Sequence, residues 1–128
     1  MSRDGDEVTV TLPRDRAFYP IAHLVLGGVG TRLSLTVDHL EDLRLALDGL
    51  FDRSDREGPV TLALRIVGDT LQASVGPFAA GLRGELEEQG DGDVNLRRLL
   101  DTVVDGVRLS EREGGDWVEL TKSVRAEV

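Results

Sequence analysis

Two aspartates, Asp48 and Asp52, are the side chains whose type and spacing best suit metal-assisted chemistry. They stand four residues apart, so a helix would place them on one face. Carboxylate oxygens are preferred ligands of hard cations such as Mg²⁺, and a carboxylate can also act as a general base. The question is whether the helix that carries this pair turns it toward a substrate.

The other polar candidates do not form a recognisable catalytic or metal site. His23 lies between apolar residues and is interpreted as a half-buried, hydrogen-bonded histidine, while His39 is interpreted as a surface residue. The two do not have metal-ligand spacing. Ser54, Ser74 and Ser110 have no base beside them in the sequence. The chain has no cysteine, which excludes thiolate catalysis and cysteine-bound metal.

Acidic residues gather at two places. Asp38, Glu41 and Asp42 stand where a helix is expected to begin, so capping and the helix dipole explain them. The acids between Glu85 and Asp93 are interpreted as a solvated face and loop. An acidic docking patch for a basic partner is the alternative.

Composition and charge narrow the class of protein. The 128 residues suit one domain over 1–128, with residues 1–6 expected to be disordered, and 40% are hydrophobic. A net charge of −9 disfavours direct contact with nucleic acid or an anionic membrane. The charged start MSRDGDE does not resemble a signal peptide, and the longest apolar run is too short to span a membrane. We therefore expect a cytoplasmic location.

Periodicity and turn residues predict strands and helices in alternating pairs. The three glycines at 27, 28 and 30 are expected to end the first helix, because they follow it rather than precede it. Gly68-Asp69 predicts a tight hairpin. The predicted strands are 7–12, 60–67, 70–75, 107–109 and 117–124, and the predicted helices are 16–28, 38–52, 79–89 and 96–105.

This order predicts an α/β fold: a two-layer sandwich of helices on one mixed, largely antiparallel sheet. The first helix would bury Phe18, Ile21, Ala22, Val25 and Leu26. The second would bury a stripe of apolar residues, broadened at its edge: Leu40, Leu43, Leu45, Ala46, Leu47, Leu50 and Phe51.

Three stretches, taken in order, resemble the anti-sigma-factor serine kinases of the GHKL ATPase superfamily. The first is VTVTLPRDRAFYPIAHLVLGGVGTRLSLTVDHLEDLRLAL, with a strand ending in Leu-Pro, a helix, and an acidic-capped helix containing EDL. The second is the hairpin RIVGDTLQASV, and the third is LLDTVVDGVRL followed by GDWVELTK. The resemblance covers nearly the whole chain, rests on this colinear order, and implies a GHKL-type (Bergerat-like) fold.

The resemblance also assigns two nucleotide-site positions to the second predicted helix. The family's general-base Glu corresponds to Gly49, and its Mg²⁺-binding Asn corresponds to Arg53. Glycine has no side chain, and a guanidinium has no acceptor for Mg²⁺, although it could touch a phosphate. A register shift of one residue would bring in Asp48 and Asp52 but rotate the helix by about 100°, turning its leucines out of the core.

The family's other nucleotide motifs are also altered. Its Asp-x-Gly-x-Gly loop, in which the Asp binds adenine, corresponds to a stretch beginning Gly76-Pro77-Phe78 that keeps one glycine and lacks the Asp. Its glycine-rich phosphate turn corresponds to GDVNL, whose acid, Asp93, and single glycine suit phosphate poorly. Thr121 matches an adenine-side Thr, although threonine is favoured in strands anyway.

The resemblance therefore implies a non-catalytic regulatory module that resembles an anti-sigma factor and has a degraded, vestigial ATP site. Implied partners are a sigma factor, an anti-anti-sigma protein or a second copy of the chain in a dimer. No cofactor is expected, and Mg-ATP would bind only if the site were intact. The family docks sigma through its first helix and neighbouring surface, so we expect partner contacts at Arg14 and Arg16.

Two alternatives remain open. One is an active ATP-dependent anti-sigma-factor serine kinase with a divergent site that uses Asp48 or Asp52. The other is a small-ligand sensor that uses the vestigial pocket. If the segment after the third strand folds over that pocket, Phe78 and Leu82 are the expected plugs.

Overall fold

Strands with alternating apolar and polar residues build the sheet of this protein. A computed structural model describes residues 7–52, 58–78, 84, 86, 96–112 and 115–123. In β2, Leu62, Leu64 and Ile66 are buried, whereas the residues between them are more exposed. The strands are β1 (Glu7–Leu12), β2 (Val60–Val67), β3 (Thr70–Phe78), β4 (Gly106–Arg112) and β5 (Gly115–Ser123).

The five strands have the order β1-β2-β3-β5-β4, and every neighbouring pair is antiparallel. The expectation of a mixed sheet is therefore wrong in that detail: β2 and β3, and β4 and β5, pair as hairpins, and β1–β2 and β3–β5 are antiparallel across longer connections. The hairpin expected at Gly68-Asp69 is confirmed, with Gly68 at a φ of 63°. β3 also continues to Phe78, three residues beyond its predicted end.

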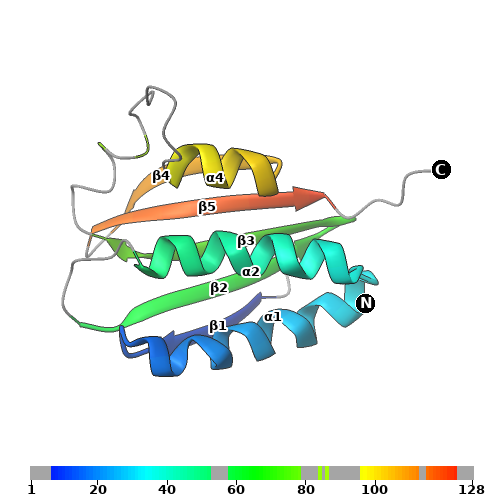
Figure 1. Ribbon diagram of the computed structural model, residues 1–128, viewed down its shortest axis with the longest axis horizontal. Coiled ribbons are helices and arrows are strands. Elements are labelled where there is room, and N and C mark those ends of the chain that lie inside the picture. Colours follow the sequence, from blue (N-terminus) through cyan, green and yellow to red (C-terminus); the bar gives the residue numbers. More distant parts are fainter. Residues whose placement is uncertain are drawn as a thin grey trace.

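In the described part of the chain, the helices α1, α2 and α4 form the second layer, on one face of the sheet (Figure 1). They are α1 (Tyr19–Leu33), α2 (Val37–Asp52) and α4 (Leu96–Val103), and a short 3₁₀ turn, η1 (Arg16–Phe18), precedes α1. Figure 1 shows α2 in the middle, between α1 and α4. The core lies between this layer and the sheet, and confirms the predicted two-layer α/β fold.

The first helix ends later than the sequence predicts. Asp15 caps η1 by accepting a hydrogen bond from the Ala17 amide at 2.9 Å, as expected. α1 then runs through its glycines and ends at Ser34, whose φ is 56°. A Cβ on Gly30 would lie 2.7 Å from Leu35 Cδ1, so this glycine permits close packing instead of ending the helix.

The second helix starts at a different cap from the expected one. The Thr36 hydroxyl accepts a hydrogen bond from the His39 amide at 3.1 Å, and the Thr36 amide donates to His39 Nδ1 at 3.3 Å. The two residues satisfy each other's groups in the manner of a capping box. Asp38 therefore lies inside the first turn, where its charge favours the helix dipole.

The single lysine ties two neighbouring helices, α2 and α4, to the sheet. The Lys122 ammonium donates to Asp42 of α2 at 3.1 Å and to the carbonyl of Val103, the last residue of α4, at 2.7 Å. Its side chain is only 12% exposed. The buried neighbours on β5, Val118 and Leu120, face the same layer.

Some predicted features fall outside the described residues: the disorder of 1–6, Arg53, Leu82 and the phosphate-turn match before Leu96. Of the helix predicted over 79–89, only Gly84 and Leu86 are described, both helical. None of the described helices is long and apolar enough to cross a membrane.

The opposite face of the sheet is polar, and a tryptophan packs on a glycine there. A Cβ on Gly76 would lie 2.6 Å from Trp117 Cδ2, so position 76 has no room for a side chain. The Arg112 guanidinium covers the other side of the indole, 4.6 Å from its centroid. Trp117 thus anchors the start of β5.

Replacing Gly76 with alanine is expected to destabilise the fold by about 1–3 kcal/mol, because the new methyl group would force the Trp117 ring to move. Denaturant unfolding followed by tryptophan fluorescence measures the change. Gly106→Ala is the matched strand control, since its Cβ would meet Thr121 Cβ at an ordinary 3.5 Å. Equal stability of both variants would contradict the packing role of Gly76.

Candidate functional site

The helix position matched to the family's general base faces leucines. Gly49 lies on the side of α2 that packs against α4, where a Cβ would be 2.8 Å from Leu99 Cδ2 and 3.5 Å from Leu96 Cδ1. Leu96 is buried. A longer side chain at position 49 therefore requires Leu99 to move.

The two candidate aspartates turn the other way, toward α1. Asp48 accepts from His23 Nε2 at 2.8 Å, which confirms His23 as a half-buried, hydrogen-bonded histidine. Asp52 accepts from the Tyr19 hydroxyl at 3.1 Å and pairs with Arg16 at 3.0 Å. These contacts join the start of α1 to the second half of α2.

The pKa of Tyr19 is raised above its ordinary value. Partial burial, and then its hydrogen bond to the Asp52 carboxylate, raise the pKa of Tyr19 from 10.0 to about 12. Its ring also packs on Phe51, with centroids 5.0 Å apart. The phenol is therefore held neutral as a donor, which suits a structural contact.

Gly76 and Thr121 both lie on the open face of the sheet. Thr121 pairs with Gln72, which faces away from the helices, and Gly76 lies under Trp117 on that same face. Gly49 is on the helix side. The structure therefore does not bring Gly49, Gly76 and Thr121 together around one cavity, and Arg53 is not among the described residues.

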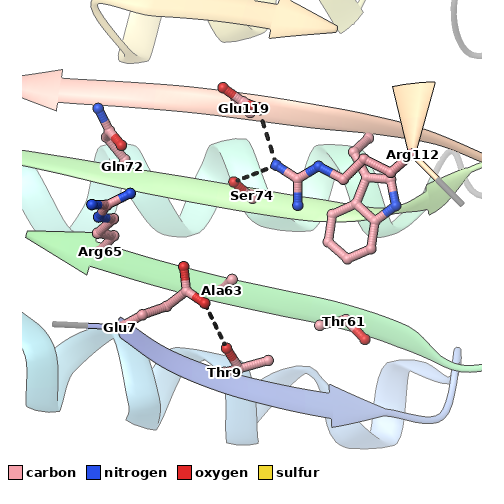
Figure 2. Close-up of a pocket in the computed structure, with 10 residues that line it drawn as sticks. Glu7, Thr9, Thr61, Ala63, Arg65, Gln72, Ser74, Arg112 and Glu119 are labelled. Atoms are coloured by element: carbon pink, nitrogen blue, oxygen red, sulfur yellow. Dashed lines mark hydrogen bonds and ion pairs between the residues drawn. The ribbon is translucent and has the colours of Figure 1, made fainter. Parts of the chain in front are cut away.

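A polar cavity of about 300 Å³ lies on this open face. Figure 2 shows Arg112 directed at Ser74 and Glu119, which it approaches at 3.5 Å and 3.1 Å. Arg65 and Glu7 line the far side of the cavity. One cation of this cavity, Arg112 of β4, is already paired with an acid of the neighbouring strand, Glu119 of β5.

Phe78, one of the two side chains expected to cover the old pocket, is buried, and its role in filling such a pocket stays a prediction. It is 1% exposed and belongs to the core together with Leu86. Leu86, in the segment after β3, is buried too, and this was not predicted from the sequence. Its spacing of eight residues from Phe78 suits a helical return over the core but does not identify it alone.

Arg14 is bound into the fold. Its Nη2 donates to the Pro59 carbonyl at 3.2 Å and to the Pro77 carbonyl, and its guanidinium carbon lies 5.7 Å from the Phe78 ring centroid. Arg14 thus connects the end of β1 to β2 and β3. A charge reversal here would also break these contacts and lower stability, so partner binding at Arg14 stays a prediction that such a variant does not isolate. Arg16, by contrast, has a side chain that is 78% exposed.

An apolar groove of about 470 Å³, which was not predicted from the sequence, lies between α1 and α2. Leu24 and Gly27 of α1 and Val37 and Leu40 of α2 line it. Leu24 falls outside the predicted apolar stripe of α1. A leucine at such a position is the feature of the sequence that could have indicated the groove. The predicted buried stripes of the two helices include Ile21 and Leu45, which are exposed in the structure.

Among the residues that the structure describes, no cluster of three or more His, Asp or Glu side chains could hold a metal ion. This follows from the pairing above, since the acids of α2 are spread over three directions. Asp42 faces Lys122, Asp48 faces His23, and Asp52 faces Tyr19.

Comparison with known proteins agrees with this architecture. No family model matches the chain. The serine-protein kinase RsbW of Bacillus subtilis is 23% identical over 150 residues, covering 99% of this chain and 91% of RsbW. A shorter match, 36% identical over 74 residues, covers 58% of this chain and 45% of the transcriptional repressor NrdR of Erythrobacter litoralis.

The crystal structure of the RsbU and RsbW domains of a Mycobacterium tuberculosis protein superposes with a TM-score of 0.63 at 15% identity. The match covers 93% of this chain and about a third (32%) of that one. The fold is thus the GHKL-type two-layer sandwich. The chain is a distant relative of the RsbW anti-sigma-factor serine kinases, and this relationship supports a regulatory, anti-sigma role.

A double-mutant cycle tests the contact between Gly49 and Leu99. Gly49→Ala gains up to about 1 kcal/mol of helix propensity but must displace Leu99. The alanine should therefore be more stabilising in a Leu99→Ala background, with a coupling of about 0.5 kcal/mol or more in denaturant unfolding. Gly28→Ala, which meets nothing within 4 Å, should be additive with Leu99→Ala. Additivity in both cycles would contradict the contact.

Alkaline titration tests the Tyr19 contact, and the chain has only one tyrosine to observe. Tyrosinate absorbance should appear with a pKa of about 12, and Asp52→Asn should lower that value. Because the folded-state pKa is raised, the stabilising effect is complete below pH 10 and is lost as pH rises toward 12. A titration near 10.0 in the folded protein would refute the contact.

Proposed function

We propose that this chain is a non-catalytic regulatory protein-binding module that acts as an anti-sigma factor. Its partners would be a sigma factor or an anti-anti-sigma protein, and it would bind them without needing Mg-ATP. A homodimer is part of this proposal, by similarity to the anti-sigma-factor kinases.

The observation that carries the proposal is the surroundings of Gly49. At this position a kinase of the family needs a carboxylate beside the nucleotide, and here Leu99 and Leu96 occupy the space above a glycine. Leu96 is buried, and a buried leucine stabilises the fold by about 1.5–3 kcal/mol. Leu99 is half-buried, and its Cδ2 is the atom that a side chain at position 49 would meet first. The slot fits neither a general base nor a phosphate.

The described residues also do not fit Mg²⁺. The ion needs several oxygen ligands converging on one point. Asp48 and Asp52, the nearest carboxylates to Gly49 in sequence, instead engage His23 and Tyr19 on the α1 side. This arrangement disfavours the alternative of a divergent kinase that relies on either aspartate.

The charge of the chain favours a basic protein partner. With a net charge of −9, long-range attraction would speed encounter with a positively charged surface. Arg16 is the exposed cation nearest the start of α1, at the end of the helix expected to meet the partner.

Arg16→Glu is the direct test of the partner surface. It should weaken binding to sigma factors or anti-anti-sigma proteins from the same genome by about tenfold, because in this proposal Arg16 meets an acidic side chain of the otherwise basic partner and the new carboxylate would repel it. Stability should change by less than about 1 kcal/mol, since only one exposed ion pair with Asp52 is lost. Binding is measured by interferometry with and without Mg-ATP, and stability by thermal unfolding.

Arg97→Glu is the control, because Arg97 also forms one exposed ion pair, with Asp101 of α4. Equal effects of both reversals would count against α1 as the partner surface. Transfer of phosphate from ATP to a serine of an anti-anti-sigma protein would overturn the non-catalytic assignment.

A further inference from the structure

The outer surface of α1 and α2 exposes two large apolar side chains beside each other. Leu24 is 75% exposed and Val37 is 74% exposed, and both line the α1–α2 groove. Single exposed apolar residues are ordinary, but two that border one apolar groove mark a contact surface. A Cβ on Gly27 would meet nothing within 4 Å, so the wall of the groove is open at that point.

We propose that the α1–α2 groove binds an amphipathic helix of a basic partner protein, which would place a leucine-sized side chain over Gly27 and lysine or arginine side chains beside the acidic residues of α2. This inference rests on the proposed function and identifies the surface and the chemistry of that partner. A hydrophobic groove is a common binding site for the apolar face of an amphipathic helix.

The charges around the groove decide which kind of helix fits. Of the five acids of α2, Asp42 and Asp52 pair with Lys122 and Arg16, which leaves Asp38, Glu41 and Arg44 as the charged residues at the groove end of the helix. Glu41 and Arg44 line the groove and pair with each other at 3.1 Å. Asp38, one turn earlier, is exposed and has no cation beside it in the described part of the chain. The local excess is negative, so a cationic flank is attracted and an anionic flank is repelled.

The same charge argues against other occupants. An anionic membrane surface would meet an acidic protein with a net charge of −9. A second copy of the chain would bring the same acidic α2 against itself across a symmetric contact. A basic helix has neither penalty.

Two glycines on α1 provide a matched pair of variants. Gly27→Leu puts a side chain into the groove, whereas Gly28→Leu puts one on an exposed position that does not line it. Neither added Cβ meets another atom within 4 Å. Leucine also has a higher helix propensity than glycine, so both variants should fold at least as well as the parent chain.

The probe is a synthetic amphipathic helix of roughly five turns with one leucine stripe flanked by lysines, and its twin carries glutamates instead. Fluorescence anisotropy should show that the lysine peptide binds the parent chain and Gly28→Leu alike. Gly27→Leu should weaken binding by about tenfold or more, and the glutamate peptide should bind at least about tenfold more weakly than the lysine peptide.

Equal binding of the peptide to both glycine variants, or no binding to the parent chain, would overturn the groove assignment even if a sigma factor still binds elsewhere. Self-association that Gly27→Leu abolishes in sedimentation would assign the groove to a second copy instead. If the peptide result is as expected but no sigma factor or anti-anti-sigma protein binds, the groove stands and the proposed function fails.

Discussion

Burial of one apolar stripe on α2 determines where the other side chains of that helix point. Leu43, Leu47 and Leu50 are at most 1% exposed and lie over the sheet. Rotating α2 by one residue would expose them, at a cost of about 5–9 kcal/mol, which is comparable to the whole stability of a domain. The rotation is therefore fixed, and it sends Asp48 and Asp52 toward α1 and Gly49 toward α4.

The same constraint explains what the sequence could predict. Alternating strands and the leucine stripe of α2 depend on local periodicity, so the bounds of β1, β2 and α2 were predicted to within one residue. β3 and β4 are longer than predicted. The same stripe argues against a register shifted by one residue to bring in Asp48 and Asp52. In the structure, both carboxylates point away from Gly49, toward α1.

Features that depend on distant contacts could not be predicted. Gly30 looked like a helix terminator, but its role is to admit Leu35, which only the folded helix pair reveals. Arg14 looked like a free surface cation until the ends of β2 and β3 came beside it. The side of the sheet that Thr121 faces likewise depends on its register with Gln72.

The two sides of α2 thus have different uses. On the α4 side, leucines fill the space where a related kinase would keep its general base, and this packing stabilises the domain. On the α1 side, Glu41 and Arg44 flank the apolar groove that we propose as the partner site. We propose a scaffold that regulates by binding, with the packing of α2 against α4 at Gly49 contributing to its stability.

Calorimetric titration of the folded protein with Mg-ATP tests the central claim most directly. Because Leu99 and Leu96 stand against Gly49 and both nearby aspartates are engaged, the account predicts no heat of binding. Saturable binding in roughly the micromolar range, about −8 kcal/mol, would contradict it and restore a nucleotide-dependent mechanism.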